Sequence, residues 1–121
     1  HPAIDLVAAQ YFQPLTVSVA AAACRMMPFK FGRQFKETYG LDFRDYVVRF
    51  RIREACRLLR NPDAQIAEVG YAVGFSEPAY FTKTFKKLIG VPPSHVVGNQ
   101  ALAYEFMEEG KQESKTLSRK S

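Results

Sequence analysis

Hydrophobic side chains recur along this chain every three to four residues, in short runs separated by glycine, proline and small polar residues. Such a period places the apolar residues of each run on one face of an α-helix. The pattern predicts an all-α protein. The expected helices cover residues 4–12, 19–24, 28–39, 43–60, 66–73 and 77–89.

The stretch from Gln65 to Val97 has the layout of a helix-turn-helix. Gly74 is expected to take a left-handed turn conformation after the first helix, and Phe75 to point from the turn into the core. Ser76 is expected to cap the second helix, which should begin at about Glu77. The residues expected on the apolar side of the first helix are Ile66, Val69, Tyr71 and Val73.

The second helix of this motif has an apolar and a basic side. Phe81, Phe85 and Leu88 recur at helical spacing and are expected to face the core. The residues left on or beside the outer face are Ala79, Tyr80, Lys83, Lys86 and Lys87. A helix with such a face is shaped to enter a DNA major groove.

Segment 43–60 lacks glycine and proline, so it predicts a single helix of about 18 residues and about 27 Å. It carries two apolar stripes, which imply packing partners on two sides. The first stripe is Phe43, Tyr46, Val47 and Phe50, and the second is Val48, Ile52, Ala55 and Leu59.

Four arginines share one edge of this long helix: Arg49, Arg53, Arg57 and Arg60. They either form a solvated basic face or include side chains that reach DNA phosphates. In the second case Arg49 is the first choice.

The two halves of the chain repeat one arrangement: a short helix, a turn, then a helix with phenylalanine, basic residues and a terminal glycine. Aligning them matches Arg33 with Lys83 and Gly40 with Gly90. The repeat predicts two helix-turn-helix subdomains joined by the long helix. Two such recognition helices could occupy successive major-groove segments, about 34 Å apart on one side of B-DNA.

Charge supports a polyanionic partner without proving one. The chain has a formal net charge of +5, and residues 25–90 hold 13 Lys/Arg against 7 Asp/Glu, a net +6. Such an excess favours nucleic acid or an anionic membrane face. No apolar run reaches the roughly 20 residues of a bilayer span, and the first 15 residues lack the design of a signal peptide. Because the sequence begins with His1, we expect a fragment of a longer chain.

Cys24 and Cys56 lie in helical contexts and are expected to pack as small buried thiols, which fits a reducing cytoplasm. Two cysteines form neither a disulfide framework nor a zinc site. His95 has no cysteine or serine near it that is arranged as a nucleophile, and the sequence contains no phosphate-binding glycine loop. We therefore expect no catalytic residue, no metal and no cofactor.

Between about Leu15 and Val97 the sequence resembles the DNA-binding domain of the AraC/XylS family of bacterial transcription regulators. The resemblance is strongest in IAEVGYAVGFSEPAYFTKTFKKLIGVPPS and extends to the long helix through Tyr46, Arg51 and Ala55. It implies seven helices. The expected division is a first subdomain with the long helix in residues 1–60, a second subdomain in 61–100, and a short helix with a polar tail in 101–121.

In that family, outward residues in the first turns of each recognition helix meet base edges. Carried over, the resemblance implies base contacts from Phe29, Lys30, Gly32 and Arg33 in the first unit and from Glu77, Pro78, Ala79, Tyr80 and Lys83 in the second. Arg33 and Lys83 are the best candidates because arginine or lysine can donate to guanine O6 and N7. The residues expected at phosphates are Lys36, Arg49, Lys86 and Lys87.

The first unit departs from the family pattern at its turn. Arg25 stands where the turn glycine is usual, and Met27 stands where a capping serine is usual. We expect Met26 to pack locally. For Phe29 two interpretations stay open, namely packing against the turn and contact with a thymine methyl group.

These features predict sequence-specific binding of double-stranded DNA by a transcription regulator, with recognition helices at about 28–39 and 77–89. The resemblance implies a separate N-terminal sensory or dimerisation domain and, on activation, a contact with RNA polymerase. The alternative is a helical protein-interaction module whose basic face docks acidic surfaces. An enzyme is the least supported class.

Overall fold

The computed structural model describes residues 1–99, and within them the chain forms six α-helices and one short 3₁₀ helix. The all-α fold with two helix-turn-helix subdomains is confirmed. The helices are α1 (Pro2–Gln10), α2 (Val17–Ala23), α3 (Pro28–Tyr39), α4 (Phe43–Leu58), α5 (Ile66–Ala72), α6 (Pro78–Ile89) and η1 (Pro93–His95). The helix and tail expected in 101–121 lie outside the described residues.

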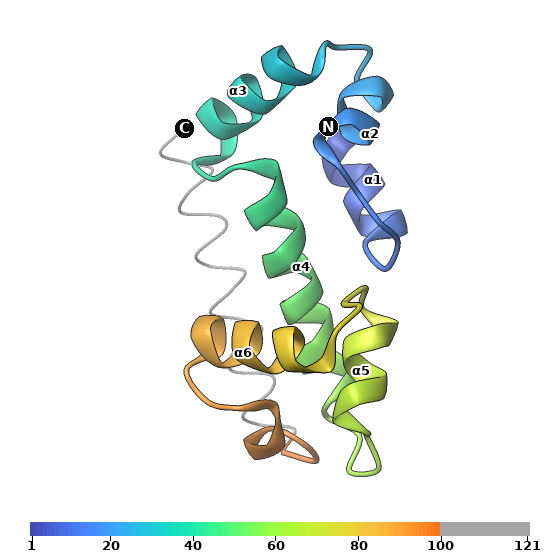
Figure 1. Ribbon diagram of the computed structural model, residues 1–121, viewed down its shortest axis with the longest axis vertical. Coiled ribbons are helices and arrows are strands. Elements are labelled where there is room, and N and C mark those ends of the chain that lie inside the picture. The colour runs from blue at the N-terminus through green and yellow to red at the C-terminus, as the bar shows by residue number, and fades with distance from the viewer. Residues whose placement is uncertain (100–121) are drawn as a thin grey trace.

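Helix α4 runs lengthwise through the molecule and carries one unit at each end (Figure 1). The first unit consists of α1, α2 and α3, and the second of α5, α6 and η1. Helices α2 and α3 form one helix-turn-helix, and α5 and α6 form the other. Each unit therefore carries its own second helix of the motif, α3 or α6, and both units pack on α4.

Several helix boundaries follow from residues that satisfy free backbone groups. Thr16 caps α2 by accepting from the Val19 amide at 3.2 Å, and Asp42 caps α4 by accepting from the Asp45 amide at 2.8 Å. Gly40 and Gly90 end α3 and α6 with left-handed backbone, at φ 80° and 97°. Both recognition helices thus stop in the same way, as the sequence repeat predicted.

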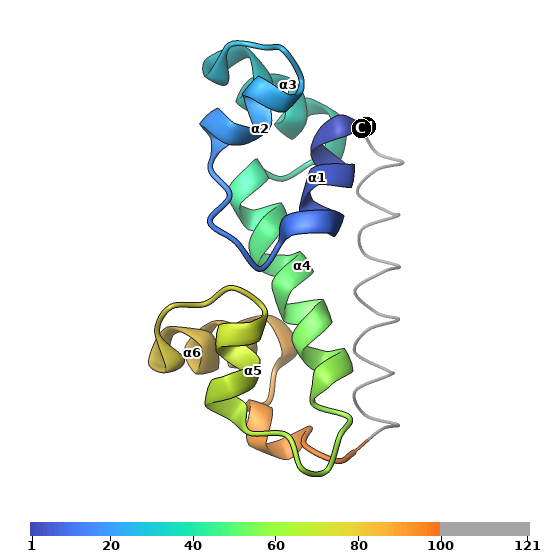
Figure 2. The same ribbon diagram turned by 90° about the vertical axis from the view of Figure 1, so that its right-hand side faces the viewer.

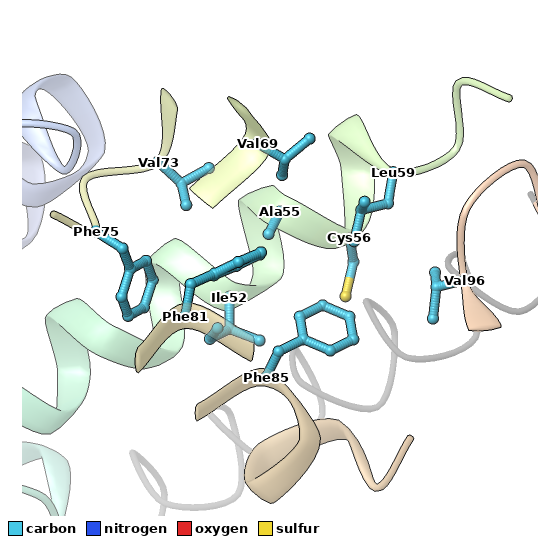
Figure 3. Close-up of a cluster of buried hydrophobic side chains, with 10 residues drawn as sticks. All are labelled: Ile52, Ala55, Cys56, Leu59, Val69, Val73, Phe75, Phe81, Phe85 and Val96. Atoms are coloured by element: carbon cyan, nitrogen blue, oxygen red, sulfur yellow. The ribbon is translucent and has the colours of Figure 1, made fainter. Parts of the chain in front are cut away.

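The two apolar stripes of α4 pack into two separate hydrophobic clusters. The early stripe joins the first cluster, whose buried members are Ala3, Val7, Ala20, Ala21, Phe31, Phe35, Phe43 and Val47. The later stripe joins the second cluster, whose buried members are Ile52, Ala55, Cys56, Leu59, Val69, Val73, Phe75, Phe81, Phe85 and Val96 (Figure 3). The prediction of packing partners on two sides of α4 is confirmed.

Two expectations for the second helix-turn-helix were wrong. Tyr71 does not face the core, because it is 54% exposed, and Gly70 is buried against α6 instead. Ser76 does not cap α6, because the helix begins at Pro78 and Glu77 takes the N-cap position without a side-chain capping bond. The turn itself forms as expected, with Gly74 at φ +108° and Phe75 5% exposed.

Other boundaries differ from the sequence prediction by one or two residues, among them the end of α1 at Gln10 rather than residue 12 and the start of α2 at Val17 rather than residue 19. Helix α1 begins at Pro2 rather than at residue 4, because the ring Nδ1 of His1 accepts from the Ala3 amide and caps the helix. Helix α4 ends at Leu58, two residues before the expected end, and Leu59 is its C-cap.

The turn between α2 and α3 contains the departure that the sequence indicated. Arg25 adopts φ +56°, a left-handed conformation that is strained for a residue with a Cβ atom. Met27 is the N-cap of α3 and makes no side-chain capping bond. The first recognition helix is therefore preceded by a strained residue and lacks a side-chain N-cap.

Replacing Arg25 with glycine should raise the free energy of unfolding by about 1 kcal/mol, because glycine takes positive φ without strain. The gain is partly offset by the greater freedom of glycine in the unfolded chain. Chemical denaturation monitored by circular dichroism measures the change. Arg25→Ala is the control, since it removes the charge and keeps the strain. Equal stability of the two variants would refute the strain at this turn.

Candidate nucleic-acid interface

The two recognition helices lie on the same side of the molecule. Figure 1 shows α3 and α6 crossing opposite ends of α4, and in Figure 2 one end of each of these helices lies to the left of α4. The first turns of α3 and α6 therefore project in one general direction. That arrangement is required if one duplex is to meet both helices.

Helix α6 buries one face and exposes the other. Phe81 and Phe85 are fully buried in the second cluster. Tyr80 is 47% exposed, and its ring centroid lies 5.6 Å from that of Phe75, which anchors it beside the turn. The predicted DNA-facing residues that are exposed in and just before α6 are Glu77, Ala79, Tyr80, Lys83, Lys86 and Lys87.

Helix α3 has the same division. Phe31 and Phe35 are buried in the first cluster, while Phe29 is 81% exposed and Met27 is 74% exposed. The packing interpretation of Phe29 is therefore wrong. Met26 does pack against the first cluster, as expected. The predicted DNA-facing residues that are exposed on α3 are Phe29, Lys30, Arg33 and Lys36.

Arg33 lies in a shallow hollow on α3 and makes an ion pair with Glu37, with 3.4 Å between Nε and Oε1. Both side chains are about 70% exposed, at 73% and 68%. Exposed pairs of this spacing typically contribute only about 0.3–0.5 kcal/mol, so the guanidinium can leave Glu37 at small cost. The hollow measures about 390 Å³ and is lined by Phe29, Lys30, Arg33, Gln34 and Glu37.

A cleft of about 550 Å³ between α4 and α6 brings predicted residues of both helices together. It places Arg49 of α4 beside Lys83 and Lys87 of α6. The carboxylates of Asp42 and Asp45 lie in the same cleft and reduce its positive charge. Lys36 and Lys86 occupy the last turns of α3 and α6, where a cation is also favoured by the helix dipole.

Neither cysteine has the surroundings of a nucleophile. Cys56 is completely buried in the second cluster, and burial raises the pKa of its thiol to about 12. Cys24 is half-buried against the first cluster. Among residues 1–99, His, Cys, Asp and Glu form no group of three or more that could hold a metal ion. No helix in that range is long and apolar enough to cross a bilayer.

Arg51 of α4, which enters the sequence prediction only through the family resemblance and without a role, makes contacts that were not predicted. Its side chain donates to two backbone carbonyls between α1 and α2, and it lies against the turn of the second helix-turn-helix. Besides the resemblance, the sequence signal for these contacts is the position of Arg51 on α4 between Phe50 and Ile52, which belong to the two apolar stripes.

Comparison with known proteins gives consistent matches. A family profile described as a helix-turn-helix domain matches residues 20–99. The HTH-type transcriptional regulator GlxA of Rhizobium meliloti is 37% identical over 81 residues, which are 67% of this chain and 25% of that protein. The MmsAB operon regulatory protein of Pseudomonas aeruginosa is 35% identical over 74 residues, covering 61% of this chain and 24% of that protein.

Among solved structures, a transcriptional regulator of Chromobacterium violaceum described as AraC-type superimposes with a TM-score of 0.76 at 25% identity. The match covers 83% of this chain and 89% of that one. The chain thus spans about a quarter of the length of the two curated relatives and most of the solved domain.

Proposed function

The chain belongs to the AraC-type helix-turn-helix family, and from this premise we propose that it is the sequence-specific DNA-binding part of a bacterial transcription regulator. The observation that carries the proposal is the placement of α3 and α6 on one side of the molecule, each with an exposed basic face. The two helices would enter successive major-groove segments of double-stranded DNA, one helical turn apart.

Base contacts are assigned to the exposed side chains of the first turns: Phe29, Lys30, Arg33, Glu77, Ala79, Tyr80 and Lys83. Arg33 and Lys83 would donate to guanine, whereas Phe29 has no donor and its exposed ring suits a thymine methyl group. Phosphate contacts are assigned to Lys36, Arg49, Lys86 and Lys87, which would supply affinity and register without choosing a sequence.

The whole regulator would contain more than this chain, since the two curated relatives are about four times as long as the matched part. An N-terminal sensory or dimerisation domain would supply the regulation, and activation would involve a contact with RNA polymerase. Binding to a bacterial chromosome would place the protein in the cytoplasm, and the proposed function includes no catalysis.

Selecting bound duplexes from a random pool, with the parent chain and with Arg33→Ala and Lys83→Ala, tests the proposal. The parent chain should enrich one motif. Each variant should lose preference mainly at one position, by about 1–3 kcal/mol of discrimination, because a bidentate base contact is worth that much.

Gln34→Ala and Thr82→Ala are the matched controls, since both residues are exposed neighbours outside the assigned set. They should leave the motif unchanged. Uniform weakening by Arg33→Ala would identify a phosphate contact instead of a base contact. Weak, sequence-blind binding by the parent chain would refute sequence-specific recognition and favour a basic protein-docking module.

A further inference from the structure

Arg51 connects the middle of α4 to the first unit. Its Nε donates to the carbonyl oxygen of Tyr11 at 2.7 Å, and its Nη2 donates to that of Gln13 at 2.8 Å. Both acceptors belong to the segment between α1 and α2. The planar guanidinium therefore holds two points of this backbone at once, which a lysine ammonium cannot do with the same geometry.

The turn of the second unit reaches the same guanidinium. A Cβ atom built on Gly74 would lie 2.8 Å from Arg51 Nε and 2.9 Å from the Tyr11 carbonyl oxygen. Only a residue without a side chain permits this approach, and the φ of +108° at Gly74 also requires glycine. The two helix-turn-helix units thus meet at Arg51.

The packing of Tyr11 and the partial burial of Arg51 also stabilise this junction. The Tyr11 side chain packs against both hydrophobic clusters, and its ring centroid lies 5.2 Å from that of Phe50. Burial lowers the pKa of Arg51, and the Tyr80 side chain acts in the opposite direction. Hydrogen bonds from an ionised donor are stronger than those between neutral groups.

We infer that Arg51 is a positioning residue that fixes the separation and angle between α3 and α6, and so restricts the chain to DNA sites with one spacing between their two halves. The inference rests on the proposed DNA binding. The physical reason is that inserting one base pair moves the second half-site by about 3.4 Å and rotates it by about 35° around the duplex. A fixed pair of helices cannot follow that displacement, whereas a hinged pair can.

The first test uses a selected site and derivatives with one base pair added or removed between the halves. The parent chain should bind the altered spacings at least about tenfold more weakly, because one helix then loses base contacts. Arg51→Met removes both hydrogen bonds and keeps much of the side-chain volume. For this variant, the dissociation constant at an altered spacing divided by the dissociation constant at the native spacing should fall to about three or less.

Arg51→Lys, which keeps the charge, should give an intermediate ratio and serves as the milder variant if Arg51→Met does not fold. The ratio is the decisive readout, since a purely structural role would weaken binding at all spacings alike. An unchanged ratio in folded Arg51→Met, or an equal loss at every spacing, would overturn the inference.

A second test needs no DNA, so it separates this inference from the proposed function. Spin labels on Gln34→Cys of α3 and Thr82→Cys of α6, both exposed positions, report the distance between the recognition helices in a Cys24→Ala background. The distance distribution should be narrow with Arg51 and broader with methionine. Equal widths would refute the positioning role even if the chain binds DNA, and a broader distribution would support it even if no DNA site were found.

Discussion

Replacing Gly74 with alanine is expected to lower the free energy of unfolding by about 2–6 kcal/mol, which is a large part of the stability of a small domain. Two effects add at this position. Alanine disfavours φ +108°, and its Cβ would lie 2.8 Å from Arg51 Nε and 2.9 Å from a backbone oxygen. The backbone oxygen cannot give way as a flexible side chain would. Denaturant unfolding of parent and variant measures the difference.

Two glycines separate the contributions of strain and collision. Gly90 has a φ of +97° but no neighbouring atom within 4 Å of an added Cβ, so Gly90→Ala introduces strain alone. Gly70 lies within α5 and does not take a positive φ, but an added Cβ would lie 2.8 Å from the Phe81 ring. Gly74→Ala should be more damaging than Gly90→Ala by about 1–3 kcal/mol. Equal losses would show that the two units do not meet closely at Gly74.

The burial pattern of the long helix could be predicted from the sequence because helical periodicity encodes which residues share a face. The positions of Val47 and Ile52 on different stripes sufficed to indicate two clusters. The same rule would have excluded Tyr71 from the core, since at 100° per residue it lies about 200° from both Val69 and Val73. The wrong prediction for Tyr71 arose because its apolar character was considered without its angular position around the helix axis.

The exposed faces of α3 and α6 could also be predicted, since they are the complement of the buried phenylalanines. The junction at Arg51 could not. Its acceptors are backbone carbonyls, which have no side-chain signature, and Tyr11 is 40 residues away in the sequence. A contact of this kind depends on how two units pack, and local periodicity contains no information about it. Exposure of Phe29 was likewise settled only by the fold of the α2–α3 turn.

Removing the charges of Lys86 and Lys87 together, as Lys86→Gln and Lys87→Gln, is expected to weaken DNA binding about 60-fold at 0.1 M salt. Each lysine that neutralises a phosphate releases counterions and contributes about 0.9 to the slope of log affinity against log salt concentration. The double variant should therefore reduce the magnitude of that slope by about 1.8. Because phosphates are common to all sequences, the preferred motif should not change. Titrations at several salt concentrations measure both quantities.

The matched control removes two charges from the last turn of α4 and the residues just after it. Arg57 is paired with Glu54 at 2.8 Å, and Arg60 lies one turn further along, so Arg57→Gln with Arg60→Gln lowers the net charge equally. If the position of the lysines on α6 matters, this control should change the slope by less than about 0.5. A slope that falls equally in both double variants would mean that net charge alone drives binding. The assignment of Lys86 and Lys87 to phosphates would then fail, because affinity would depend on the number of cations and not on the helix that carries them.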